Sequence, residues 1–292
     1  VEFVKGSIPR HITFDGLRVV VDCAHGAAYR VAPLVLKELG ATVIPMAVSP
    51  NGLNINENCG ATAPQLMCET VREVGAHVGV AFDGDADRAI FADEQGHVID
   101  GDQIMAACAL ALQQEGRLKG NAVTTTVMSN LGLDRAMTQA GIKMIRTSVG
   151  DRYVLERMIQ EGCNFGGEQS GHIIFLDYNT TGDGLITALQ VLSLMKKKGQ
   201  TLSELVSCIT LLPQVLVNVK VRERRDLATI PGYAQCLSQV EKRLQGSGRV
   251  LVRYSGTESA VRIMIEGDDR QEISRMAQDL ADPIRLAIGF GG

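Results

Sequence analysis

The stretch VGVAFDGDADRAIFA, residues 78–92, carries the clearest structural signal in the chain. Two short apolar runs, residues 78–82 and 89–92, are typical of buried strands. Between them lie Asp83, Asp85 and Asp87, followed directly by Arg88. So much negative charge in one loop repels itself unless a cation is bound. The stretch therefore predicts a strand, a metal-binding loop and a second strand.

The same residues allow two other interpretations of this loop. Asp83, Asp85 and Asp87 fall at positions 1, 3 and 5 of an EF-hand loop, and Glu94 falls at position 12. However, an EF-hand needs glycine at position 6, where this chain has Arg88, and it needs flanking helices. A solvated acidic turn would explain neither the arginine nor the apolar flanks. Three carboxylates with an open face are more typical of a Mg²⁺ site.

Composition excludes several classes of protein. With 29 basic and 33 acidic side chains, the net charge does not favour a nucleic-acid surface. No stretch approaches the roughly 20 apolar residues of a membrane span, and residues 1–5 lack the charged-then-apolar order of a secretory signal. Seven scattered cysteines without a CxxC pair favour a reducing cytoplasm. A chain of 292 residues is expected to form two or three domains.

The remainder of the first two thirds alternates strand and helix signals, which predicts parallel sheets covered by helices. Strands are expected at 17–21, 42–46, 122–127 and 143–145, and helices at 27–39, 64–74, 103–114 and 131–139. The two sets look like a repeated α/β unit with a boundary near residues 100–103. From Pro213 the pattern changes to strands at 214–221, 249–253 and 261–266 and helices at 233–244 and 270–288. This predicts a small α+β domain with an antiparallel sheet.

A second polar loop, residues 166–172, has the sequence GGEQSGH. Its glycines allow the backbone to approach a ligand closely, while Glu168, Ser170 and His172 offer partners for sugar hydroxyls. A polar hairpin turn without a ligand is the alternative.

A third loop follows the strand at 249–253. Arg253, Ser255, Gly256 and Thr257, with Arg262 on the next strand, combine two guanidinium groups with hydroxyls and backbone amides. That combination is typical of a phosphate-binding loop, although a solvated turn between two strands is the alternative for this loop alone.

These three loops, in this order, resemble those of the α-D-phosphohexomutase superfamily, and the residues around them resemble its phosphoglucosamine mutase branch. The similarity to that branch lies in Asn51–Asn56, Cys59–Thr62, Val149–Glu156 and Thr180–Gly184. One departure is Ser259, where family members commonly have proline.

The resemblance implies two consecutive α/β/α domains followed by the small α+β domain. Residues 1–11 would be the end of a preceding domain, 12–101 a metal-binding domain, 102–212 a sugar-binding domain and 213–292 a phosphate-binding domain. The phosphoserine loop of the family belongs to that preceding domain, and no Ser-His dipeptide occurs in this chain. The chain alone is therefore expected to be inactive.

The resemblance also implies roles for the candidate residues. Asp83, Asp85 and Asp87 would hold Mg²⁺, with Arg88 as a second electrophile. Glu168 and Ser170 would bind sugar hydroxyls. The residues expected to bind the phosphate that does not react are Arg253, Ser255, Gly256, Thr257 and Arg262. His172 and Asp151 would lie near the sugar as alternative proton-transfer residues.

The implied activity is a mutase that interconverts glucosamine 6-phosphate and glucosamine 1-phosphate. A phosphoserine enzyme and glucosamine 1,6-bisphosphate would be its intermediates, in the cytoplasmic synthesis of UDP-N-acetylglucosamine and peptidoglycan precursors. The alternatives are a phosphomannomutase or phosphoglucomutase, and a non-catalytic module that binds a metal and a sugar phosphate. The expected partner is the phosphosugar, not nucleic acid or a membrane, and a homodimer is the candidate assembly.

Overall fold

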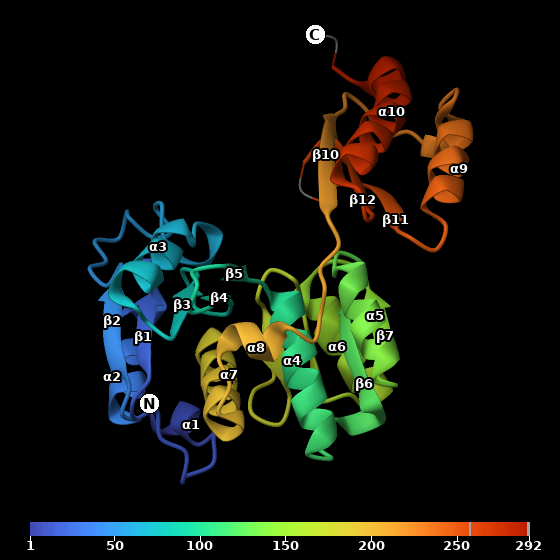
Figure 1. Ribbon diagram of the computed structural model, residues 1–292. Coiled ribbons are helices and arrows are strands. Elements are labelled where there is room, and N and C mark those ends of the chain that lie inside the picture. Colours follow the sequence, from blue (N-terminus) through green and yellow to red (C-terminus); the bar gives the residue numbers. More distant parts are fainter. Residues whose placement is uncertain (257, 291–292) are drawn as a thin grey trace. The chain divides into compact units, whose positions relative to one another are not determined.

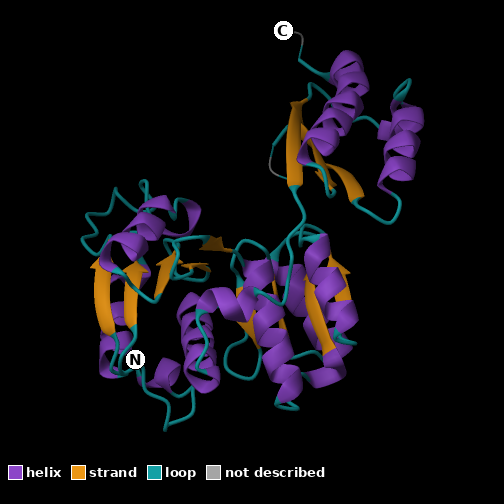
Figure 2. Ribbon diagram, viewed as in Figure 1, coloured by secondary structure: helices purple, strands orange, loops and turns teal. Residues whose placement is uncertain are grey.

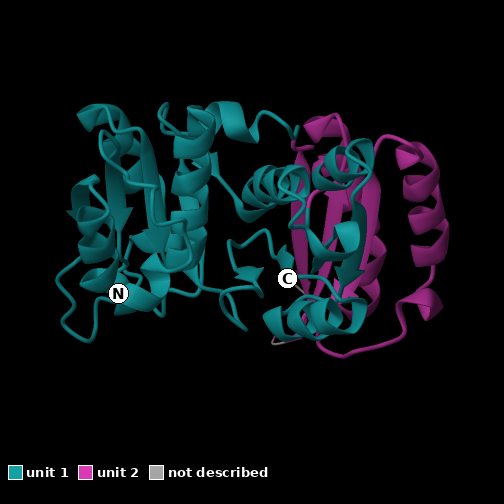
Figure 3. Ribbon diagram, turned by 90° about the horizontal axis from the view of Figure 1, so that it is seen from below, with its two compact units in different colours: residues 1–129, 133–210 teal, residues 130–132, 211–292 magenta. Residues whose placement is uncertain are grey.

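The computed structural model describes residues 1–256 and 258–290 and divides them into two compact units. The first unit holds residues 1–129 and 133–210, and the second holds residues 130–132 and 211–292 (Figure 3). Two sheets lie in the first unit and one in the second (Figure 1).

The first sheet has the strand order β2-β1-β3-β4-β5. Strands β1 (Arg18–Asp22), β2 (Thr42–Met46) and β3 (Val78–Phe82) run parallel, whereas β4 (Ala89–Ala92) and β5 (Val98–Ile99) are antiparallel additions. Every residue of β3 is buried, as expected for a strand covered on both faces. This explains why residues 78–82 read as a continuous apolar run.

The second sheet repeats this plan in the order β7-β6-β8-β9. Strands β6 (Ala122–Thr126), β7 (Lys143–Thr147) and β8 (Phe165–Gly167) are parallel, and β9 (Ile173–Phe175) returns antiparallel. In both sheets the first strand is central, the second pairs on one side and the third on the other. The acidic loop follows β3 and the GGEQSGH loop begins with the last two residues of β8, so the two loops occupy equivalent positions at the end of the last parallel strand.

Helices surround these two sheets (Figure 2). One of them, α7 (Gly184–Lys198), contacts β3 and β4 of the first sheet and β9 of the second, and most of its residues are buried. A helix that is apolar on most sides is suited to this position between two sheets. The other helices and 3₁₀ turns of residues 1–210 are α1 (Glu2–Lys5), η1 (Ala27–Tyr29), α2 (Val31–Glu38), η2 (Gly60–Thr62), α3 (Gln65–Val74), α4 (Gly101–Gln114), η3 (Lys119–Asn121), α5 (Leu131–Gln139), α6 (Asp151–Glu161) and α8 (Leu202–Val206).

One predicted helix begins later than expected. The pattern over 27–39 predicts a single helix, but the structure has the 3₁₀ turn η1 followed by α2, which starts at Val31. Pro33 provides the physical reason, because a helix begun at Ala27 would need a backbone N–H at that position. As the third residue of α2, Pro33 lies in the first turn, where no such donor is required.

The second unit has an antiparallel sheet in the order β10-β12-β11. Its strands are β10 (Gln214–Lys220), β11 (Arg249–Tyr254) and β12 (Ala260–Glu266), and its other elements are η4 (Leu227–Thr229), α9 (Tyr233–Leu244) and α10 (Arg270–Ile288). Alternate residues of β12, including Val261 and Ile263, pack with α10 residues in one apolar core. The predicted fold class, two α/β/α domains and a small α+β domain, is confirmed.

The helices of the described residues include none that is both long and apolar enough to cross a bilayer.

Candidate active site

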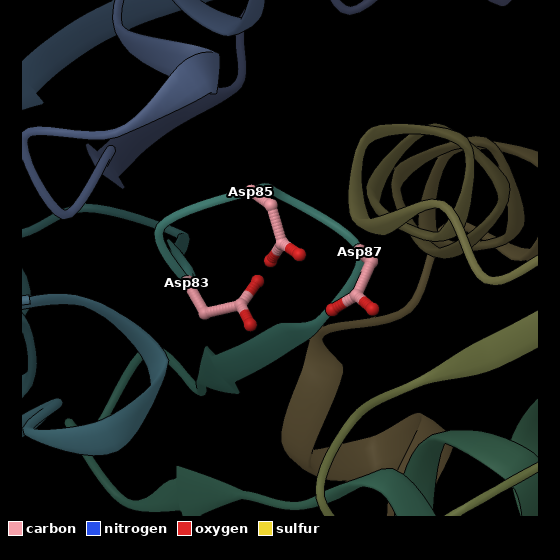
Figure 4. A group of neighbouring side chains, drawn as sticks. All are labelled: Asp83, Asp85 and Asp87. Atoms are coloured by element: carbon pink, nitrogen blue, oxygen red, sulfur yellow. The ribbon is translucent and has the colours of Figure 1, made fainter. Parts of the chain in front are cut away.

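The acidic loop brings its three carboxylates together. Asp83 is buried, Asp85 is exposed and Asp87 is intermediate. Each offers one carboxylate oxygen, and these oxygens lie within 4.8 Å of one another. Figure 4 shows all three side chains turned toward the inside of the loop. The predicted metal ligands are therefore neighbours in space as well as in sequence.

Backbone hydrogen bonds hold the loop in this shape. Ala86 has a positive φ of 64°, and its N–H donates to the carbonyl of Asp83 at 3.1 Å. The carbonyl of Gly84 accepts from Ala27 at 2.8 Å, and the carbonyl of Ala86 accepts from Gly184 at 2.9 Å. The loop is thus attached both to the segment after β1 and to the start of α7.

Arg88 forms an ion pair within the loop. Its Nε lies 2.7 Å from Asp83 Oδ2 and 3.4 Å from Asp87 Oδ1, and its backbone N–H donates to Asp83 Oδ1 at 3.1 Å. Burial opposes the charged form of Arg88, but Asp83 and Asp87 outweigh it and raise its pKa above the ordinary value. Arg88 therefore stays charged and offsets one of the three carboxylate charges.

The remaining charge suits a divalent cation. Asp87 Oδ1 is buried and makes no hydrogen bond among the described residues, although Arg88 Nε lies 3.4 Å away as an ion-pair partner. A buried anionic oxygen with only this long contact is costly, and a hard cation that prefers oxygen ligands would satisfy it. The residues present therefore fit the predicted Mg²⁺.

The GGEQSGH loop is joined directly to the acidic loop. The N–H of Ala89 donates to the carbonyl of Gly171 at 3.1 Å, and Gly171 has a positive φ of 91°. A Cβ at Gly171 would lie 2.4 Å from the Ala89 carbonyl oxygen, so this approach requires glycine. His172 is 3% exposed, and its Nδ1 lies 3.1 Å from Asp87 Oδ2. The two loops therefore form one site.

The other predicted site residues of the first unit are less closely connected to the acidic loop. Glu168 Oε1 accepts a hydrogen bond at 3.1 Å from the N–H of Gly150, the residue before α6. Asp151, the first residue of α6, and Ser170 are both exposed. Among the described residues, neither side chain is hydrogen-bonded to another predicted site residue. Both remain available to a ligand.

The second unit contains the predicted phosphate loop. Arg253 and Arg262 are directly opposite each other in the pairing of β11 with β12. Burial, together with the charge of Arg262, lowers the pKa of Arg253 below its ordinary value. Arg262 Nη2 donates to Glu258 Oε2 at 3.0 Å, while its Nε is buried without a partner among the described residues. Two adjacent guanidinium groups with an unused donor are suited to binding an anion.

Ser255 shapes the turn beside these arginines. It is 1% exposed, its N–H donates to the carbonyl of Ala260 at 2.8 Å, and its Oγ accepts from the N–H of Glu258 at 3.2 Å. Gly256 has open space where a Cβ would be. Thr257, also predicted to bind phosphate, lies outside the described residues.

Comparison with protein-family models decides the family. Residues 2–96 match the phosphoglucomutase/phosphomannomutase α/β/α domain II, residues 100–211 match α/β/α domain III, and residues 216–282 match the C-terminal domain. The chain belongs to the phosphoglucomutase/phosphomannomutase family.

Relatives in this family include phosphoglucosamine mutases. The chain is 54% identical over 287 residues to the phosphoglucosamine mutase of Syntrophotalea carbinolica, and 53% identical over 289 residues to that of a Geobacter species. These alignments cover 98% and 99% of this chain but only 63% and 64% of the relatives. The chain thus spans slightly less than two thirds of their length.

Solved structures of the family share the fold. A phosphoglucomutase/phosphomannomutase family protein from Burkholderia thailandensis has a TM-score of 0.78 at 19% identity, covering 99% of this chain and 65% of that one. The N-acetylphosphoglucosamine mutase of Aspergillus fumigatus, solved with GlcNAc-6P and magnesium, has a TM-score of 0.77 at 22% identity. That match covers 97% of this chain and 68% of the fungal chain.

The sequence does not predict the contacts that join the segment after β10 to the phosphate loop. Tyr254 Oη accepts from the N–H of Arg225 at 2.9 Å and donates to the carbonyl of Arg225 at 2.6 Å. Arg224 Nη2 donates to the carbonyl of Ser255 at 2.7 Å, and its guanidinium lies 5.7 Å from the Tyr254 ring centroid. These contacts fix the segment after β10 against the loop. Arg222, Arg224 and Arg225 were the only available signal in the sequence, and they do not identify a partner.

Replacing Tyr254 with phenylalanine should lower the free energy of unfolding by about 1 kcal/mol, because both hydrogen bonds to Arg225 are lost and the ring is kept. Urea unfolding of the variant would measure this change. Tyr153→Phe, on the exposed side of α6, is the matched control and should change the stability little. Equal stability of the two variants would contradict the structural role of the Tyr254 hydroxyl.

Proposed function

We propose that this chain supplies the metal-binding, sugar-binding and phosphate-binding parts of a phosphoglucosamine mutase. The reaction would interconvert glucosamine 6-phosphate and glucosamine 1-phosphate, an intramolecular phosphoryl transfer. The observation that carries the proposal is the hydrogen bond between Ala89 and Gly171, which joins the three-aspartate loop to the GGEQSGH loop. The identity of 54% to a phosphoglucosamine mutase supports this choice of substrate.

In this proposal Asp83, Asp85 and Asp87 hold Mg²⁺. When bound, the ion supplies electrostatic stabilisation for the charge on the transferring phosphoryl group. Arg88, already held by Asp83, adds a fixed positive charge at the same place.

Glu168 and Ser170 would orient the sugar through its hydroxyls, and Asp151, which follows the Gly150 that donates to Glu168, would lie near the sugar. The phosphate that does not react would be held by the loop of the second unit, with Arg253, Ser255, Gly256, Thr257 and Arg262 as its ligands. Gripping that phosphate in either orientation of the sugar would retain a bisphosphorylated intermediate between the two transfers.

The phosphoryl donor would be a phosphoserine, and glucosamine 1,6-bisphosphate would be the intermediate. None of the five histidines of this chain follows a serine, so the Ser-His pair of the family's donor loop is not among its 292 residues. We therefore expect the chain to bind its ligands without turnover. We assign residues 12–101, 102–212 and 213–292 to the metal-binding, sugar-binding and phosphate-binding domains.

We place the protein in the cytoplasm, in amino sugar metabolism leading to peptidoglycan precursors. Sedimentation analysis would show whether it forms a homodimer.

Calorimetric titration with glucosamine 6-phosphate in the presence of Mg²⁺ tests the proposal. We expect binding to weaken by roughly 10- to 100-fold in Arg253→Gln and in Arg262→Gln, because charge-assisted hydrogen bonds to phosphate are lost. Arg275→Gln, an exposed arginine on α10, is the matched control and should bind as the wild-type chain does.

Two results would contradict this account. One is the absence of phosphosugar binding, and the other is equal binding by the three arginine variants. Tighter binding of mannose 6-phosphate or glucose 6-phosphate than of glucosamine 6-phosphate would favour a phosphomannomutase or phosphoglucomutase instead.

A further inference from the structure

We propose that Lys220 is a further ligand of the phosphate held by the second unit, where it joins Arg253 and Arg262 as a third cation. The inference rests on the proposed function, because it concerns the same phosphate site. It adds to that site a residue of β10, a strand from which the sequence predicted no ligand.

The side chain of Lys220 lies on the same face of the sheet as those of the two arginines. Alternate residues of all three strands pack with α10 residues in one apolar core. Because side chains alternate along a strand, Lys220, Arg253 and Arg262 point to the opposite face. The three cations therefore share the face that is turned away from this core.

The register of the strands places Lys220 within reach of the phosphate loop. Lys220 pairs with Ala260 on β12, and the carbonyl of Ala260 accepts from the N–H of Ser255 at 2.8 Å. Arg262, two residues further along β12, is thus a diagonal neighbour of Lys220, a separation that long side chains can bridge. Since Ala260 has only a methyl group, the four-carbon stem of the lysine can extend across it toward Ser255.

Within the described chain, no acidic side chain holds Lys220 elsewhere. The residue is exposed and has no hydrogen bond or ion pair among residues 1–256 and 258–290. At the outer edge of β10 it borders a hollow together with Arg222 and Arg285, and none of the described residues that line this hollow is acidic. Arg285 is itself bound to Asp282, at 2.9 Å. The charge of Lys220 is therefore unpaired on both sides.

A bound phosphate would offset this concentration of positive charge. Burial and the charge of Arg262 already lower the pKa of Arg253, so the two arginines oppose each other's charge. A third unpaired cation on the same face adds to the repulsion unless an anion is present. A phosphate monoester carries about −1.5 to −2 charges at pH 7, and lysine binds phosphate as a point charge.

Calorimetric titration of the intact chain with glucosamine 6-phosphate and Mg²⁺ tests this role. We expect Lys220→Gln to weaken binding by roughly 10-fold, because a charge-assisted contact is lost. Lys220→Arg keeps the positive charge and should bind within about 3-fold of the wild-type chain. Lys242→Gln, at an exposed lysine of α9, is the matched control and should bind as the wild-type chain does.

Salt distinguishes a phosphate ligand from a merely structural residue. The difference in affinity between Lys220→Gln and wild type should shrink in about 0.5 M NaCl, because screening weakens the attraction that the variant lacks. A difference that salt leaves unchanged, or equal losses in Lys220→Gln and Lys220→Arg, would overturn the inference. Wild-type affinity in Lys220→Gln, together with weakened binding by Arg253→Gln, would overturn it and leave the proposed function standing.

Inorganic phosphate tests the site without the sugar. In NMR spectra of the chain with isotope-labelled methyl groups on its lysines, the Lys220 signal, identified by its loss in Lys220→Arg, should shift when phosphate is added. Arg253→Gln should reduce that shift, and no shift in the wild-type chain would overturn the inference. Failure of the proposed function is distinguishable, because Lys220 would then respond to inorganic phosphate although glucosamine 6-phosphate bound no more tightly than phosphate itself.

Discussion

Replacing Asp85 with asparagine should weaken Mn²⁺ and Mg²⁺ binding by at least about 100-fold while changing the free energy of unfolding by less than about 0.5 kcal/mol. Asp85 is the exposed member of the three carboxylates, and the loop's backbone hydrogen bonds and the Arg88 ion pairs do not involve its side chain. The substitution therefore removes a charged ligand and leaves the support of the loop intact.

Calorimetric titration of the metal, paired with urea unfolding, measures both quantities on the same protein. Asp279→Asn is the matched control, because it makes the same change of charge at an exposed position on α10. If both variants bound the metal as tightly as wild type, Asp85 would not be a ligand. A large loss of stability in Asp85→Asn would show instead that the loop depends on this side chain.

Of the proposed substitutions, Gly26→Ala should have the largest effect on stability. We expect the free energy of unfolding to fall by about 3 kcal/mol. The backbone of Gly26 is extended, with φ −111° and ψ −159°, so any residue can adopt it. However, a Cβ there would lie 2.2 Å from the carbonyl oxygen of Gly84 and 2.7 Å from its Cα. Both atoms belong to the backbone of the acidic loop, so the loop itself would have to move.

The substitution should therefore weaken Mn²⁺ binding as well as folding, and thermal unfolding with and without Mn²⁺ would measure both. Gly6→Ala is the matched control, since Gly6 has an ordinary φ of −64° and its Cβ would lie no closer than 3.2 Å to its neighbours. Similar stabilities of the two alanine variants would contradict the close approach of Gly26 to Gly84.

The structural features that the sequence predicts are those determined by residues close together in the chain. Three aspartates on alternate residues of one tight loop are close in space whatever surrounds them, and apolar runs such as 78–82 follow from burial on both faces of a strand. The start of α2 also has a local cause, Pro33. The helical pattern over 27–39 nevertheless predicted an earlier start.

The contacts that complete the site depend on the tertiary fold. His172 and Asp87 are 85 residues apart, and Tyr254 and Arg225 are 29 residues apart. Neither pairing follows from residue type or spacing, since several polar side chains could have occupied the same positions.

Anomalous diffraction from crystals of this chain soaked in Mn²⁺ would test the central claim most directly. We predict one Mn²⁺ peak contacting carboxylate oxygens of Asp83, Asp85 and Asp87, with the second oxygen of Asp87 still bonded to His172. A soaked crystal with no peak at this loop, or with its ordered Mn²⁺ elsewhere, would contradict the account.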